Sequence, residues 1–93
     1  MSDLVKLSTV ATTAAILAEP GTLHGAVLTA GADTATVILY DNTNAATGTV
    51  LVKLSAVTNT SVCWTPDWAV SARVGIYAAV TGTTPSATVY FKP

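Results

Sequence analysis

The stretch TATVILYDNTNAATGTVLVKLS (Thr34–Ser55) decides the fold, because it has the pattern of two β-strands joined by a polar turn. Successive strand residues point to opposite faces of a sheet, so Ala35, Val37 and Leu39 are expected on one face and Thr36, Ile38 and Tyr40 on the other. For the return strand the pattern predicts one face with Val50, Val52 and Leu54 and an opposite face with Leu51, Lys53 and Ser55. The Asn, Asp and Gly residues between the two segments are typical of turns. We therefore expect an antiparallel hairpin.

Short alternating segments also lie on both sides of this hairpin. The predicted strands are Thr9–Leu17, Thr22–Thr29, Thr60–Thr65, Arg73–Val80 and Ser86–Lys92. A short helix over Ala14–Ala18 stays open, because these residues are good helix formers. Six to eight short strands at regular spacing predict an all-β fold, an antiparallel β-sandwich or jelly roll.

The chain of 93 residues has room for one domain. Its first residues are polar and weakly patterned. We interpret residues 1–9 as an N-terminal arm and residues 10–93 as a single β-sandwich domain.

The composition indicates that part of the surface is covered by other subunits. Charged residues make up 10% of the chain and hydrophobic residues 51%, whereas about 25% charged residues is usual. Large side chains also fall on the predicted outer faces of the strands: Ile38, Tyr40, Leu51, Tyr77 and Tyr90. A homo-oligomer would bury them.

Charge and cysteine content exclude several classes of partner. The net charge is −1, with neither sign clustered, so the sequence disfavours nucleic-acid binding. No segment approaches the roughly 20 apolar residues of a membrane span. The single Cys63 cannot form an internal disulfide, which favours a reducing site of synthesis.

Few residues suit catalysis or metal binding. His24 is the only histidine, and we interpret it as a strand-edge or interface residue; three copies around a three-fold axis could bind a metal. Asp41, Asn42 and Asn44, with Asp33 at the other end of the same strand, indicate turn chemistry or, alternatively, a calcium ion. No acids, bases or nucleophiles are grouped, so we expect no enzyme activity and no cofactor.

Two tryptophans flank a turn in the segment WTPDW, Trp64–Trp68. They could close the end of the sandwich, contact a subunit or partner, or form a platform that stacks on sugars. The residues we predict at an oligomer or partner interface are Tyr40, Tyr77, Tyr90, Trp64, Trp68 and His24.

Four motifs resemble a group of small β-rich virion proteins of tailed bacteriophages, including cyanophages. They are Gly21-Thr22-Leu23-His24-Gly25, Leu39-Tyr40-Asp41-Asn42, Gly48-Thr49 and Thr88-Val89-Tyr90-Phe91, and the similarity extends over roughly residues 10 to 92. The Trp64–Trp68 segment is bulkier than the turn that the resemblance implies.

The resemblance implies a capsid cement or decoration protein. Such a protein would bind the major capsid protein on the outside of an icosahedral head, as a homotrimer, after synthesis in the host cytoplasm. Another virion component (tail, baseplate or head fibre) is an alternative. A small carbohydrate-binding module, with Trp64, Trp68 or Tyr77 stacking on sugars, is an alternative from a different class.

Overall fold

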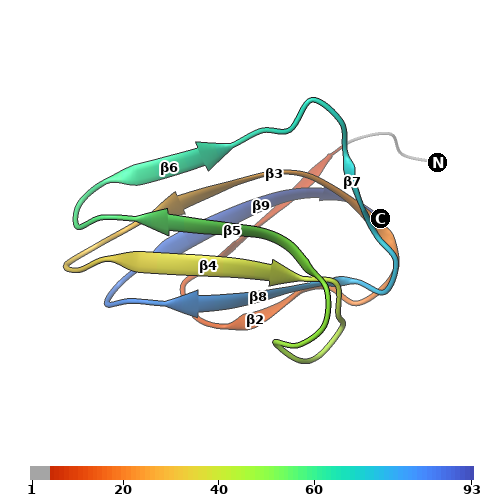
Figure 1. Cartoon of the computed structure of the whole chain (residues 1–93), viewed down its shortest axis with the longest axis horizontal. Helices are drawn as coiled ribbons and strands as arrows, with labels where there is room; N and C mark the ends of the chain where they lie inside the picture. The colour runs from red at the N-terminus through yellow and green to blue at the C-terminus, as the bar shows by residue number, and fades with distance from the viewer. Residues whose placement is uncertain (1–4) are drawn as a thin grey trace.

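The computed structural model describes residues 5–93, which form nine β-strands. The strands are β1 (Lys6–Val10), β2 (Ala14–Leu17), β3 (Gly21–Thr29), β4 (Ala35–Tyr40), β5 (Val50–Ala56), β6 (Ser61–Trp64), β7 (Val70–Ala72), β8 (Ile76–Thr81) and β9 (Ser86–Lys92). One sheet has the order β1-β9-β3-β6, with β7 also paired to β3, and the other has the order β2-β8-β4-β5. The sheets lie face to face (Figure 1). The predicted all-β sandwich is confirmed.

The chain path is that of a jelly roll, with the β4–β5 hairpin at the tip of one long folded hairpin. Outward from this tip, β3 pairs with β6 and β7, β2 pairs with β8, and β1 pairs with β9. The long hairpin curls, so β9 also pairs with β3 and β8 with β4. All of these pairings are antiparallel, and together they make the two packed layers.

The β4–β5 hairpin forms as its alternation predicts. Ala35, Val37 and Leu39 are fully buried, and the residues between them are half-buried on the outer side. In β5, Leu54 lies opposite Val37 in the register and is buried as well. The inward side of this hairpin supplies much of one wall of the core.

Two side-chain assignments in the hairpin are wrong. Leu51, expected on the outer face, packs against the core. Val50 was expected to share a face with Val52 and Leu54, but it is 50% exposed and lies opposite Tyr40. The pairing shifts between Leu39 and Tyr40, and an extra residue in one strand reverses the alternation beyond it.

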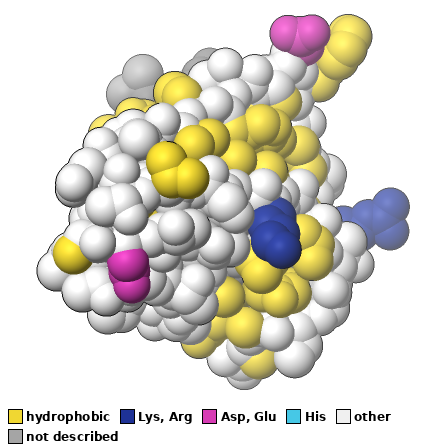
Figure 2. Space-filling view, turned by 60° about the vertical axis from the view of Figure 1, so that its left-hand side comes forward, with side chains coloured by type: hydrophobic (Ala, Val, Ile, Leu, Met, Phe, Trp, Pro, Cys, Tyr) yellow, Lys and Arg dark blue, Asp and Glu magenta, His cyan; other side chains and the backbone are white. Residues whose placement is uncertain are grey.

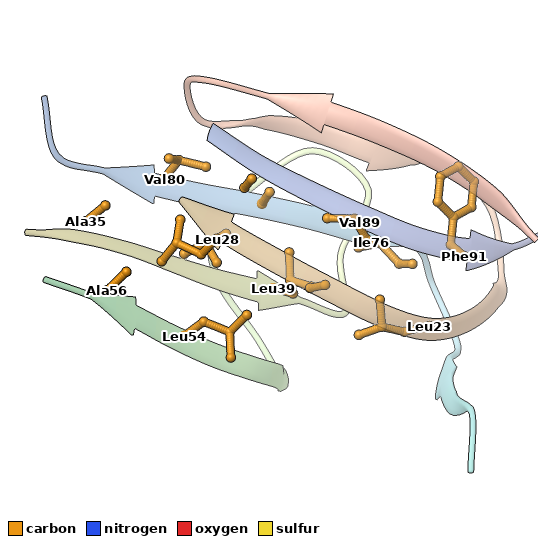
Figure 3. Packing of buried hydrophobic residues seen from close by; sticks show 14 of the residues in the cluster. Leu23, Leu28, Ala35, Leu39, Leu54, Ala56, Ile76, Val80, Val89 and Phe91 are labelled. Carbon is orange, nitrogen blue, oxygen red and sulfur yellow. The ribbon is translucent and has the colours of Figure 1, made fainter. Parts of the chain in front are cut away.

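The core lies between the sheets and draws on both. Its largest fully buried side chains are Leu23, Leu28 and Val89 from one sheet and Val37, Leu39 and Ile76 from the other. In Figure 3 the side chains of β3 and β9 point towards those of β4, β5 and β8. No polar or charged residue is buried among the described residues, so hydrophobic burial holds the two layers together.

The N-terminal segment differs from the prediction. β1 begins at Lys6 and pairs with β9 along its length, so the boundary expected after residue 9 falls within a strand. Residues 1–4 of the predicted arm lie outside the described residues. The segment Thr9–Leu17 is divided between two strands in different sheets, and the helix left open over Ala14–Ala18 does not form, because β2 pairs with β8.

A threonine holds the point where the chain crosses between the sheets. The Oγ1 of Thr13 accepts a hydrogen bond from the backbone N–H of Val80 at 3.0 Å and donates one to its carbonyl oxygen at 3.3 Å. The hydroxyl of Thr13, the residue immediately before β2, thus bonds both the N–H and the carbonyl of Val80. The sequence pattern did not reveal this crossing, because residues 10–17 carry no turn residue such as Gly, Pro, Asn or Asp to mark it.

Candidate functional site

The described residues contain no detectable pocket and no group of three or more His, Cys, Asp or Glu side chains that could hold a metal ion. They also include no helix long and apolar enough to cross a membrane. The ring of His24 lies on β3, where its Nε2 is 2.9 Å from the hydroxyl of Thr22. The surface of the molecule therefore carries the candidate sites.

The carboxylate of Asp41 fastens the segment that leads into β8. It accepts hydrogen bonds from the backbone N–H groups of Arg73 at 3.1 Å, Val74 at 2.8 Å and Gly75 at 3.2 Å. These bonds explain why β8 begins at Ile76, later than expected. They also explain why Val74, expected on the core side, is 48% exposed.

The pKa of Asp41 is lowered by this arrangement. Partial burial acts in the opposite direction and raises it, but the hydrogen bonds from Val74, Gly75 and Arg73 and the positive charge of Arg73 together outweigh that effect. Asp41 is thus ionised and anchors a distant loop, a contact that the local turn chemistry expected for it did not predict. Asn42 supports the same turn, since its side chain accepts a hydrogen bond from the N–H of Asn44 and donates one to the carbonyl of Thr47.

A second aspartate fastens the opposite end of the sandwich. Asp33 accepts hydrogen bonds from the backbone N–H of Thr83 at 2.6 Å and from its hydroxyl at 3.0 Å. Asp33 and Asp41 stand at opposite ends of β4 and bind different loops. Their carboxylates do not converge on one site.

The outer face of the β2-β8-β4-β5 sheet carries an apolar surface that we call the tyrosine face. It consists of Ala15, Ile38, Tyr40, Val50, Tyr77 and Ala79. The register makes these residues neighbours: Tyr77 lies opposite both Ala15 and Tyr40, Tyr40 opposite Val50, and Ile38 opposite Ala79. The face is continuous across all four strands of the sheet.

One charged residue, Lys53, lies beside Ile38 in the paired positions of this face. Its side chain is exposed, whereas Ile38, Tyr40, Tyr77 and Ala79 are half-buried. In the space-filling view, hydrophobic side chains gather around one basic side chain (Figure 2). An apolar patch with a polar element beside it is typical of a surface that contacts another protein.

Tyr90 lies on the other sheet, away from the tyrosine face. It stands opposite Leu7 of β1 and Gly25 of β3, and its ring borders the position that a Cβ on Gly25 would take, at 3.8 Å. Packing over Gly25 explains why Tyr90 is half-buried within a single chain. The predicted subunit contact of Tyr90 is thus separate from that of Tyr40 and Tyr77.

The two tryptophans have different environments. Trp64, in β6, lies opposite Ala26 of β3 and packs against the core, so it closes the sandwich as one interpretation proposed. Trp68 is 83% exposed. It belongs to a segment that we call the Trp68 loop, residues 65–69, which interrupts the strand beside β3 between β6 and β7.

The structure therefore brings together two of the six predicted interface residues, Tyr40 and Tyr77. Tyr90, Trp64, Trp68 and His24 lie elsewhere. The sequence interpretation missed Val50 as a member of the tyrosine face, because its exposure depends on the shift in the hairpin. It also missed β7, a three-residue strand whose short pattern gave no distinct signal.

Comparison with protein-family models, with curated proteins and with solved structures finds no match for this chain.

Proposed function

We propose that this protein is a structural component of a bacteriophage particle, a cement or decoration protein that binds the major capsid protein as a homo-oligomer. The observation that carries the proposal is the tyrosine face: an apolar surface on a small jelly roll whose described residues have no detectable pocket. The jelly roll is a frequent architecture of viral capsid domains. The resemblance of its motifs to phage virion proteins agrees with this role.

A cement protein must resist deformation and cover other subunits, and it needs no chemistry of its own. Aspartate side chains at both ends of the sandwich anchor its loops, and the buried residues that the structure describes are all apolar. An oligomer that attaches at several points would bind tightly even though each contact is weak, because each further contact is made at high effective concentration.

The test is to purify particles of the phage that encodes the chain and to locate the protein on them. Gold-labelled antibodies raised against the purified protein should decorate the head, and mass spectrometry should detect the protein in the washed particles. Label on the tail or baseplate would assign it to another virion component. Absence from washed particles would refute a virion role.

A carbohydrate-binding module is the second candidate, favoured by the exposure of Trp68. An indole ring can stack on the apolar face of a pyranose. Sugars that shift the tryptophan fluorescence of the protein, but not that of a Trp68→Ala variant, would support this function. No shift across a broad panel of oligosaccharides would remove it.

A further inference from the structure

We propose that the Trp68 loop of one copy packs on the tyrosine face of the next copy, so that the protein assembles head to tail. This inference rests on the self-association in the proposed function and names the two surfaces that make the contact. One surface is a projecting loop that carries the negative charge of Asp67. The other is a broad apolar face that carries the positive charge of Lys53.

The Trp68 loop is built to project. β6 and β7 both pair with β3, β6 opposite Ala26–Thr29 and β7 opposite Gly21–Leu23. Between these two strands, five residues stand beside only His24 and Gly25 of β3, so the loop must leave the sheet. Because paired strands hold both of its ends, little chain entropy is lost when a partner covers it.

The side chains at the tip of the loop suit a protein contact. Trp68 has the highest exposed fraction among the large hydrophobic residues of the described chain, and tryptophan is among the residues that most often anchor interfaces. Asp67, beside it in the chain, is also exposed. The loop thus presents an indole and a carboxylate together.

The tyrosine face offers the complement of both groups. Tyr40, Tyr77 and Ile38 provide apolar area for the indole, and Lys53 is the charged residue at its paired positions. A lysine ammonium can pair with the Asp67 carboxylate, which fixes the orientation of the contact more than its strength. This match of apolar area and charge points to a second copy of the chain as the occupant.

Pairing through strand edges is less favourable. Two edge strands, β1 and β5, contain lysines, Lys6 and Lys53. The remaining edge strands, β2, β6 and β7, have only four, four and three residues. Charge and short length both oppose edge-to-edge addition of strands.

The loop and the face belong to different sheets, so the contact joins unlike surfaces. Such heterologous contacts close into rings when the rotation between copies allows it. A ring of three copies would give the trimer that we expect, with every Trp68 loop and every tyrosine face occupied.

Charge reversal tests the contact directly. We expect Asp67→Lys and Lys53→Asp each to weaken self-association at least tenfold in sedimentation velocity, and the double variant to recover most of the loss. Matched controls are Glu19→Lys and Lys6→Asp, exposed charges outside both surfaces, which should leave association unchanged. Unaltered circular dichroism spectra and melting temperatures would show that the variants fold.

Mixing distinguishes head-to-tail contact from a symmetric one. Trp68→Ala keeps the face and Tyr77→Asp keeps the loop, so each variant alone should be a monomer and an equimolar mixture should form a 1:1 dimer. An oligomeric wild type whose mass survives both Trp68→Ala and Lys53→Asp would overturn this contact while leaving self-association intact. A monomeric wild type at every concentration would overturn the contact and the homo-oligomer together.

Discussion

The two outer faces of the sandwich differ in chemistry, although the same alternation of side chains builds both. On the β1-β9-β3-β6 sheet, hydroxyl groups pair across strands: Thr9 with Thr88 and Thr29 with Ser61, each at 3.0 Å. On the β2-β8-β4-β5 sheet one such pair, Thr36 with Ser55 at 3.3 Å, lies beside an apolar area that includes Tyr40 and Tyr77.

This difference indicates where a partner binds. The inward residues of both sheets are constrained by the shared core, so they are alike, whereas the outward residues are free to vary. Both outer faces carry hydroxyl pairs and apolar side chains, but on the β2-β8-β4-β5 sheet Ile38 and Ala79 and the two residues Tyr40 and Tyr77 are paired neighbours. A continuous apolar surface of this kind gains free energy when it is covered. We therefore expect the tyrosine face of one copy to be covered by the Trp68 loop of the next.

The largest effect on stability should come from the inward side of β4. Leu39→Ala removes a fully buried side chain and should cost about 3 kcal/mol of unfolding free energy, which lowers the melting temperature by about 15 °C. The adjacent Ile38→Ala lies on the tyrosine face and should cost less than about 1 kcal/mol in the monomer. Urea denaturation of dilute protein measures both, and equal losses would contradict the assignment of the two faces.

The difference between the two outer faces can be tested by placing the same negative charge on each. Tyr77→Asp should weaken self-association at least about 30-fold, because a central interface aromatic typically contributes about 2 kcal/mol or more. Thr88→Asp, on the hydroxyl-rich face, should leave the mass unchanged. Sedimentation velocity measures both variants, and equal effects would mean that the faces are not distinct.

Removal of the charge at Asp41 should have a smaller effect on stability, and one that depends on pH. Asp41→Asn should lower the unfolding free energy by about 1.5 kcal/mol at pH 7, since a neutral amide oxygen accepts weaker hydrogen bonds than a carboxylate and the amide NH2 cannot accept the bond from Arg73. The pKa of Asp41 is lower in the folded chain than its ordinary 3.8. Its contribution is therefore complete above that value and disappears as the pH falls through the folded-state pKa.

Denaturation curves of the wild type and of Asp41→Asn should accordingly differ at pH 7 and approach each other near pH 2. A difference that stays constant over this range would show that the charge of Asp41 is not what fastens the Arg73–Gly75 segment.

The smallest effect should come from the hydroxyl pairs. Thr29→Val removes one side-chain hydrogen bond on an exposed surface and should change the unfolding free energy by about 0.5 kcal/mol or less. Chemical denaturation measures it. A loss comparable to that of Leu39→Ala would mean that this face stabilises the fold far more than its exposure indicates.

Much of the fold could be predicted because most strands alternate without interruption. Val37 and Leu39, and later Val89 and Phe91, recur at every second position, and all four are buried. The hairpin tip was equally clear from its Asn and Gly residues. Side-chain periodicity reports the direction of each residue wherever the pairing is regular.

The rest could not be predicted, since it depends on contacts between distant segments. The shift that exposes Val50 leaves the alternation of the sequence intact. The crossing held by Thr13 and Val80 carries no Gly, Pro, Asn or Asp residue to mark it. The Asp41 fastener joins residues more than 30 positions apart. For the candidate site, Tyr40 and Tyr77 could be predicted as outward residues, but their proximity follows only from the pairing of β4 with β8.

The most direct test of self-association through the tyrosine face is the mass of the purified protein across a range of concentrations. By light scattering at low micromolar concentration we expect about three times the chain mass of 9.4 kDa, and we expect Tyr77→Asp to remain at the mass of a single chain. A wild-type protein with the mass of one chain up to about 1 mM would contradict self-association through the tyrosine face, because that face would then remain exposed to water.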